Sequence, residues 1–488
     1  MSTNSRIFLR LSGAIASVVP LLALQACDDN TNACKQSGSV TVCGEFGDPI
    51  YVADLSSVSP TNSTAASASL AAQVQWPPVA IENGRIVLAA GKLLLQVSAQ
   101  GEVSKLVDVQ KNVASPSTDA AGHLYLVAAS GTGTMVAAYD DRGSGKLRWN
   151  SANLTGTPVG TPASVGSDLI YAATRDGVSS AATLYTLRQD DGTVVAARNG
   201  ASPAAVLPNG TIRYLQTPMG HDGLSANGSE GAPLFGALIA EDAKGNILWQ
   251  HAEPKGIVDF APGAEGETYI VTGGSGAITS PHSLRRVDVD GSVAWSFEAP
   301  CQDCTVAAAP TVDGDTVYFP VWEKRQAQPI DPLYAISAKD GKQLWQYDGF
   351  FTKKQEFSAA KLIVGSGDQP LDVTRTQHHP AGRPVIAADR SLYVATDGAV
   401  TALDNNGQVL GYAMYDAKAG EVSDGFSAHA STWINPGVRP SPVLGPDGTL
   451  YVWDGAAVHA FRTNRGGTSA KAWIAPYGGP SNSGRAPN

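Results

Sequence analysis

The chain has 488 residues, of which 43% are hydrophobic and only 16% charged, so it has enough apolar residues for a substantial core. Its 52 Gly and 30 Pro residues imply frequent turns and argue against long helices. The formal net charge of −10 argues against a nucleic-acid-binding protein, which would need a basic face.

Residues 1–26 have the features of an export signal. Arg6 and Arg10 precede an apolar run over residues 11–24 that is too short for a convincing membrane span. The run ends in LQAC, which resembles the lipobox of bacterial lipoproteins. The resemblance implies cleavage before Cys27, a lipid on that residue and anchorage to a bacterial membrane on its periplasmic side. Asp28 is only a weak hint of inner-membrane retention, so the choice between inner and outer membrane stays open. The alternative is an ordinary secretory signal with a chance cysteine.

We expect residues 27–75 to be a tether, because residues 53–75 are rich in Ser, Ala and Thr. A surface strand over residues 70–75 is the alternative. An exported compartment permits disulfides, and an even number of cysteines remains once Cys27 carries lipid. The disulfide candidates are two local pairs, Cys34 with Cys43 and Cys301 with Cys304.

The rest of the chain repeats two short markers. Tight turns with a glycine recur about every 45 to 65 residues, as expected for propeller blades; these glycines are Gly101, Gly145, Gly192, Gly245, Gly291, Gly341 and Gly407. Between the turns lie eight β-rich segments such as GHLYLVAA and GTLYVWDG. They place a Val or Tyr at equivalent positions, namely Val87, Tyr125, Tyr171, Tyr214, Tyr269, Tyr318, Tyr393 and Tyr451.

The repeating unit is therefore four short strands, which cannot be stable as a lone sheet but can bury its faces against identical neighbours. We predict an all-β fold, an eight-bladed β-propeller of four-stranded antiparallel blades over residues 76–475, with a tail at 476–488. A Trp ending the outer strand would wedge between adjacent sheets; the blade-docking candidates are Trp149, Trp249, Trp295, Trp345 and Trp473. The ring could close through residues 70–76 or through the C-terminal KAW strand, and we expect some sharing between the two termini.

The DGKxLW turn and the following strand resemble the repeat of the pyrroloquinoline quinone (PQQ) type β-propellers. The best copies are residues 309–347 and 120–149. With the lipobox, the chain is similar to BamB-type envelope lipoproteins, which implies a protein-binding scaffold in outer-membrane protein assembly. The other branch of the superfamily implies a periplasmic oxidoreductase that uses PQQ and Ca²⁺.

The enzyme interpretation is the weaker one. Quinoprotein dehydrogenases have two adjacent cysteines that stack on PQQ, whereas here Cys301 and Cys304 are separated by two residues. We assign no catalytic residue, no metal ligand and no cofactor. The CQDC segment is interpreted as a structural disulfide, with a metal or redox role and free thiols as alternatives. His378 and His379 are either a binding pair or part of a solvated loop.

Four insertions, at residues 217–233, 322–332, 349–382 and 413–437, interrupt the repeat. By strand position all should emerge at one end of the disc, where loops on a rigid scaffold commonly bind partners. The binding-face candidates in or beside these loops are Trp322, Phe350, Phe351, Phe357, His378, His379, Tyr415, Phe426 and Trp433. The alternative is that the aromatic rings only pin the loops to the propeller.

The leading hypothesis is thus a lipid-anchored propeller with no catalytic function, a monomer that binds protein partners in the bacterial envelope. The outer-membrane assembly machinery is the most concrete partner. The alternatives are a PQQ-dependent oxidoreductase and a propeller that binds carbohydrate or another ligand.

Overall fold

The computed structural model describes residues 35–37, 40–55, 79–81, 84–109, 113, 116–119, 121–130, 133–140, 145–165, 168–175, 182–207, 209–217, 235–273, 283–300, 304–306, 309–323, 333–347, 383–395, 399–415, 442–453, 457–467 and 472–473. The regular elements of these residues are strands, as the turn-rich composition predicts. Within this part of the chain there is no helix with the length and hydropathy needed to span a bilayer.

The described strands form seven antiparallel sheets, of which the first three follow one another along the chain. The first contains β4 (Val79–Ile81), β5 (Arg85–Ala90), β6 (Leu93–Val97) and β7 (Val103–Asp108). The second contains β8 (Ser117–Thr118), β9 (His123–Ser130), β10 (Gly133–Asp140) and β11 (Lys146–Asn150), with β12 (Leu154–Thr155) beside β10. The third contains β13 (Thr157–Val165), β14 (Leu169–Arg175), β15 (Ala182–Arg188) and β16 (Val194–Asn199).

The next two sheets are larger. One contains β17 (Ala205–Val206), β18 (Ile212–Gln216), β19 (Phe235–Glu241), β20 (Ile247–Pro262), β21 (Thr268–Thr272), β22 (Ser283–Val287) and β23 (Val293–Glu298). The long β20 belongs to two four-stranded units, because its first part pairs with β19 and its last part with β21. The other contains β25 (Thr311–Asp313), β26 (Thr316–Glu323), β27 (Leu333–Ser337) and β28 (Gln343–Tyr347), with β24 (Cys304–Val306) on β26 and β36 (Ala472–Trp473) on β25.

The last two sheets combine both ends of the described chain. One contains β29 (Val385–Ile386), β30 (Leu392–Ala395), β31 (Ala399–Leu403) and β32 (Val409–Tyr415), extended outward by β2 (Val40–Gly44) and β1 (Lys35–Ser37). The other contains β33 (Val443–Leu444), β34 (Thr449–Trp453), β35 (Ala457–Arg462) and, as its outer strand, β3 (Asp48–Asp54).

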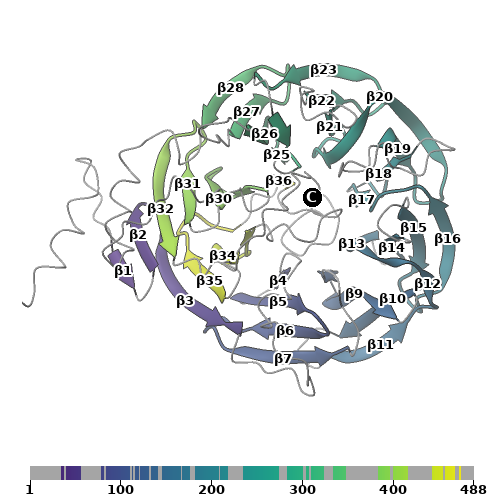
Figure 1. Ribbon diagram of the computed structural model, residues 1–488, viewed down its shortest axis with the longest axis horizontal. Helices are drawn as coiled ribbons and strands as arrows, with labels where there is room; N and C mark the ends of the chain where they lie inside the picture. Colours follow the sequence, from purple (N-terminus) through teal and green to yellow (C-terminus); the bar gives the residue numbers. More distant parts are fainter. Residues whose placement is uncertain are drawn as a thin grey trace, which may run out of the picture.

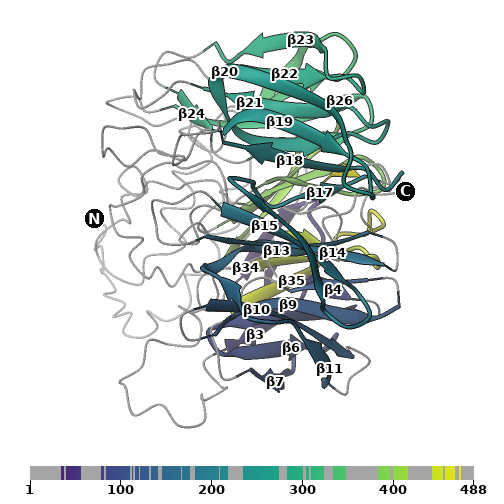
Figure 2. The same cartoon turned by 90° about the vertical axis from the view of Figure 1, so that its right-hand side faces the viewer.

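These sheets are arranged radially around a common centre, with one end strand of each nearest the centre and the other on the rim (Figure 1). Viewed from the side, the strands run between the two faces of the disc (Figure 2). Antiparallel four-stranded sheets in this arrangement are those of a β-propeller. The predicted all-β fold with four-stranded antiparallel units is therefore confirmed.

The predicted marker residues explain why the sheets pack. Each lies in the second strand of its unit, and none is more than 3% exposed; they are Val87, Tyr125, Tyr171, Tyr214, Tyr269, Tyr318, Tyr393 and Tyr451. The buried clusters combine side chains of neighbouring sheets, as when Leu88 of β5 and Tyr451 of β34 share one cluster. The apolar core therefore lies between the sheets, as the repeat predicts.

The expected sharing between the two termini is found, but it involves neither of the two predicted segments as the outer strand. The outer partner of β35 is β3, with Val52 opposite His459, so the closing strand comes from residues 48–54. Residues 70–76 lie outside the described residues, and the KAW segment forms β36 on the inner strand β25 instead. The folded part therefore includes strands within residues 40–54, which the sequence analysis assigned to the tether.

The composition of residues 53–75 suggested that the propeller begins only at residue 76, after the strands that lie within residues 40–54. Gly47 and Tyr51 have the same four-residue spacing as the turn glycine and Trp of the other units, for example Gly145 and Trp149. The strand was overlooked because its partner lies at the opposite end of the chain, where no local pattern can point to it.

Candidate functional site

Most binding-face candidates lie outside the described residues. These are Phe350, Phe351, Phe357, His378, His379, Phe426 and Trp433, together with Cys27, Cys34 and Cys301. For five further candidates the backbone is described but the side chain is not; they are Cys43 in β2, Cys304 in β24, Trp322 in β26, Tyr415 in β32 and Trp473 in β36. The disulfide and loop-binding hypotheses therefore stay predictions.

The remaining predicted residues are four Trp rings on outer strands. Each lies against the turn glycine of the next unit along the chain; the pairs are Trp149 with Gly192, Trp249 with Gly291, Trp295 with Gly341, and Trp345 with Gly407. A Cβ atom at Gly341 would lie only 2.7 Å from the Trp295 ring. The glycine is thus needed for its missing side chain as well as for its positive φ of 70°. The repeat predicts a glycine in this turn but not the ring that lies against it.

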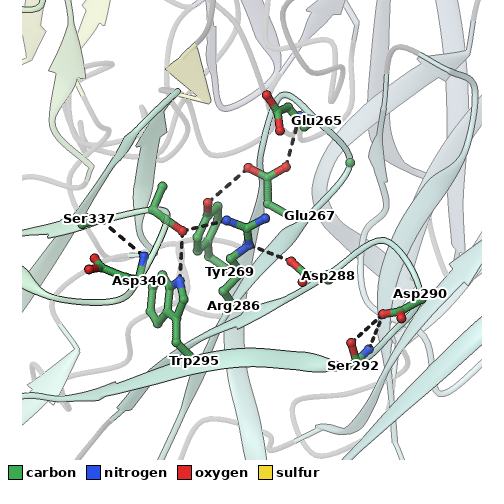
Figure 3. A network of polar contacts seen from close by, with 12 residues as sticks. Glu265, Glu267, Tyr269, Arg286, Asp288, Asp290, Ser292, Trp295, Ser337 and Asp340 are labelled. Atoms are coloured by element: carbon green, nitrogen blue, oxygen red, sulfur yellow. Dashed lines mark hydrogen bonds and ion pairs between the residues drawn. The ribbon is translucent and has the colours of Figure 1, made fainter.

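We call the contact between two neighbouring sheets at such a ring a joint. At the joint formed by Trp295, polar contacts hold the ring in place (Figure 3). The indole Nε1 donates to the carbonyl oxygen of Ala338 at 2.9 Å, and Arg286 Nη1 donates to the same oxygen at 2.8 Å. Arg286 Nε also donates to Asp288 at 2.7 Å. Tyr269 packs against Trp295 with ring centroids 5.9 Å apart. The Trp therefore links its own sheet to the turn of the following one.

Some joints work without Trp, and for two of them the sequence did not identify the residue that replaces it. Tyr51 of β3 lies against Gly101, where a Cβ atom would be 2.7 Å from its ring, so Tyr51 takes the Trp role at the closure of the ring. Between the β13–β16 sheet and β19, Arg198 forms a bidentate ion pair with the buried Glu241. Tyr214 also donates to Glu241, at 3.1 Å.

A buried guanidinium supports the Trp249 joint. Arg213 is 3% exposed, and its guanidinium carbon lies 4.8 Å from the centroid of the Trp249 ring. It donates to the carbonyl oxygen of Gly266 at 3.2 Å. Burial lowers the pKa of Arg213 to about 10, which marks the desolvation of its charge. The joint therefore relies on a cation over an aromatic face.

An Asp–His pair in the second sheet could be mistaken for a catalytic pair. Asp119 Oδ2 accepts from His123 Nδ1 and from the Tyr125 hydroxyl, each at 2.8 Å. However, Asp119 Oδ1 also accepts from two backbone N–H groups of its own turn. Asp447 holds the corresponding turn before β34 in the same way, through Thr449. We therefore interpret Asp119 as a turn residue of the repeat.

A buried ion pair joins β20 to a residue just before β29. Asp259, near the innermost part of β20, and Arg383, just before β29, are each 3% exposed, and Arg383 Nη2 lies 3.7 Å from Asp259 Oδ1. The backbone N–H of Phe260 donates to the same carboxylate at 2.7 Å. Burial raises the pKa of Asp259 to about 6, although Arg383 and this N–H act in the opposite direction. No signal in the sequence distinguishes this aspartate from the others.

The raised pKa predicts a pH dependence of stability that Asp259→Asn should remove. Below the unfolded pKa of about 4, both states hold the proton; above about 6, the folded state must hold a buried carboxylate. The contribution of Asp259 should therefore become less favourable by roughly 2–3 kcal/mol as pH rises from 4 to 7.5. Urea unfolding of the wild type and the variant at both pH values measures this difference.

Effects of the substitution that do not depend on pH, such as altered packing, cancel from the comparison between the two pH values. Asp242→Asn is a control of opposite sign, because hydrogen bonds from Asn246 lower the pKa of the exposed Asp242. Its favourable contribution is present above the unfolded pKa and is lost on acidification. An Asp259→Asn effect that is the same at both pH values would contradict the assignment.

A shallow hollow lies where both ends of the described chain meet. It has a volume of about 420 Å³ and lies between the β2–β3 connection, Asp389, and residues 463–465. We call the line where the two ends of the described chain meet the seam. Arg465 bridges it, because its guanidinium lies 2.8 Å from Glu45 and 3.0 Å from Asp389. Among the described residues there is no group of three or more His, Cys, Asp or Glu side chains placed to hold a metal ion.

Radial antiparallel sheets joined by a Trp and a turn glycine define a β-propeller with a PQQ-type repeat. Residues 232–349 match the family model described as outer membrane protein assembly factor BamB. This range includes one of the two best repeat copies predicted from the sequence, residues 309–347, so the predicted resemblance is confirmed. No curated protein sequence matches the chain.

Several solved structures match the chain at low similarity. A quinohemoprotein alcohol dehydrogenase from Pseudomonas putida HK5 is 13% identical, with a TM-score of 0.44 over 90% of this chain and 74% of that chain. Hydrazine synthase from Kuenenia stuttgartiensis is 14% identical, with a TM-score of 0.43 over 70% and 93%. A streptogramin B lyase is 11% identical, with a TM-score of 0.39 over 84% and 96%. Likenesses of this size carry no information about function.

Proposed function

We propose that the chain is a single closed propeller of eight blades that acts as a protein-binding scaffold in the bacterial envelope, anchored by lipid on Cys27. The observation that carries the proposal is the BamB family match over residues 232–349. The proposed partner is therefore a subunit of the machinery that assembles outer-membrane proteins. The choice between inner and outer membrane remains part of the hypothesis.

The surface of the matched segment supports this proposal. Nine large hydrophobic side chains are exposed among the described residues, and five of them belong to this segment: Ile247, Leu248, Val289, Val293 and Leu344. The other four occur singly on other outer strands. Four of the five lie on the outer strand segments of β20, β23 and β28, and Val289 lies in the turn between β22 and β23. Exposed apolar side chains that gather in one segment often mark a protein-binding surface.

The test is capture of barrel-assembly subunits from native membranes by the lipidated full-length chain. Changing both Ile247 and Leu248 to Ser should lower the recovered amount at least about 10-fold, because burial of each side chain contributes roughly 1.5–3 kcal/mol. The matched control changes Leu147 and Val195 to Ser; both are similarly exposed but lie outside the matched segment. Equal recovery with both variants, or no assembly subunit with the wild type, would refute the proposal.

One observation favours a second candidate, a PQQ-dependent oxidoreductase. Asp259 is a buried carboxylate with a raised pKa near the centre of the ring, and strongly shifted pKa values are often found at functional sites. Against it, the adjacent cysteines of the quinoprotein dehydrogenases are missing from the sequence. Quinone-dependent dye reduction by the soluble protein, beginning at Asp28, would discriminate in favour of this candidate.

A further inference from the structure

The N-terminal strands fasten the start of the described chain to one side of the ring. In Figure 1, β1 and β2 lie outside β32, and β3 continues along the rim, on the side opposite β16. Residues 40–44 pair in continuous register with 411–415, and β3 pairs with β35. Two neighbouring sheets thus share this attachment.

The connection between β2 and β3 makes the attachment rigid. Phe46 is fully buried, and its ring meets the edges or faces of Tyr393 and Phe461 with centroids 5.8 and 5.2 Å apart. Glu45 beside it pairs with Arg465 at 2.8 Å. An aromatic ring held by both neighbouring sheets leaves this segment little freedom to swing away from the rim.

The chain length between the proposed lipid and this attachment is short. Lys35, the first residue of β1, follows Cys27 by eight residues, a reach of at most about 29 Å even when fully extended. A tether that extended to residue 75 would have reached roughly 170 Å. The start of β1 must therefore stay within about 29 Å of a lipid on Cys27.

We infer that the rim formed by β1, β2 and β3 is the membrane-facing edge of the propeller, and that its partner is the lipid bilayer surface. The inference rests on the lipid anchor of the proposed function. The ring then stands on this edge, with β16 on the side away from the membrane. The outer strands of the β17–β23 sheet are thereby kept clear of the bilayer for a protein partner.

Energy transfer to labelled lipid tests this orientation. Val52 in β3 and Val195 in β16 are matched sites, because their side chains are 46% and 47% exposed. The lipidated full chain carries one fluorescent amino acid at either site and is bound to vesicles that contain an acceptor lipid. Transfer from position 52 should be at least about twofold greater than from position 195, since the short reach holds β3 near the surface.

Two controls separate the inference from the anchor itself. Cys27→Ser should abolish vesicle binding, and wild-type protein that does not bind vesicles would refute the anchor rather than the orientation. A flexible insert of about 40 Gly and Ser residues after Asn30 should remove the difference between the two sites, because it restores a long reach. Bound protein with equal transfer from both sites and no effect of the insert would overturn the inference.

Discussion

A chain that begins at Ser56 is expected to lose the monomeric fold, whereas a chain that begins at Asp28 keeps it. The shorter chain lacks β3 and leaves the edge of β35 unpaired. It also lacks Phe46 and Leu55, which are fully buried and contribute roughly 1.5–3 kcal/mol each. Together with the lost strand pairing, this approaches the 5–15 kcal/mol by which domains are stable. Size-exclusion chromatography and thermal unfolding followed by circular dichroism measure the result.

The control for this truncation begins at Gly38 and removes only β1. Because β1 contacts only β2 in the sheet order, this chain should unfold within a few degrees of the longer one. A folded monomer that begins at Ser56 would show that the propeller closes without β3. The unpaired edge of β35 would otherwise favour aggregation or exchange of strands between copies.

The second large effect is expected at Gly341. Gly341→Ala should cost about 2–4 kcal/mol, because alanine at a φ of 70° is strained and its Cβ would press on the Trp295 ring. Gly245 is a matched control in an equivalent turn. It has a φ of 89°, but the nearest atoms to an added Cβ lie 3.7 Å away, so Gly245→Ala should cost only about 1–2 kcal/mol of backbone strain.

A double-mutant cycle isolates the ring contact. Once Trp295 is changed to Ala, Gly341→Ala should cost no more than Gly245→Ala, because the steric conflict is gone. Urea unfolding of the single and double variants supplies the four free energies. If the losses of unfolding free energy are additive, or equal at the two glycines in the wild-type background, then the position of the Trp295 ring does not depend on the missing side chain of Gly341.

Features repeated within one unit could be predicted from the sequence. The Tyr of the second strand and the turn glycine recur at local spacings, and their burial and conformation follow from the strand and turn that contain them. The direction of the Trp contact could not be predicted, because spacing within a unit does not say which neighbouring sheet receives the ring. Tyr51 was missed as a docking ring for a related reason, since its sheet is assembled from both ends of the chain.

The buried pair of Asp259 and Arg383 could not be predicted from the sequence for a different reason. Asp259 and Arg383 are 124 residues apart, and only tertiary packing brings them within 3.7 Å. The shift in pKa comes mainly from desolvation, which depends on what surrounds the carboxylate and not on its sequence neighbours. Aspartates in turns, such as Asp242, could by contrast be recognised from the local DxxG pattern.

The seam also sets the order in which the protein can fold. Glu45 and Arg465, which meet across it, are separated by 420 residues, so the first strands made during synthesis receive their partners last. At typical translation rates of 5–20 residues per second this is a wait of roughly 20 to 80 s. During that time β2 and β3 are unpaired strands in a chain whose other sheets can already assemble from local hairpins. Pairing of β2 with β32 and of β3 with β35 is therefore a late step of folding, because both partners come from residues 409–462.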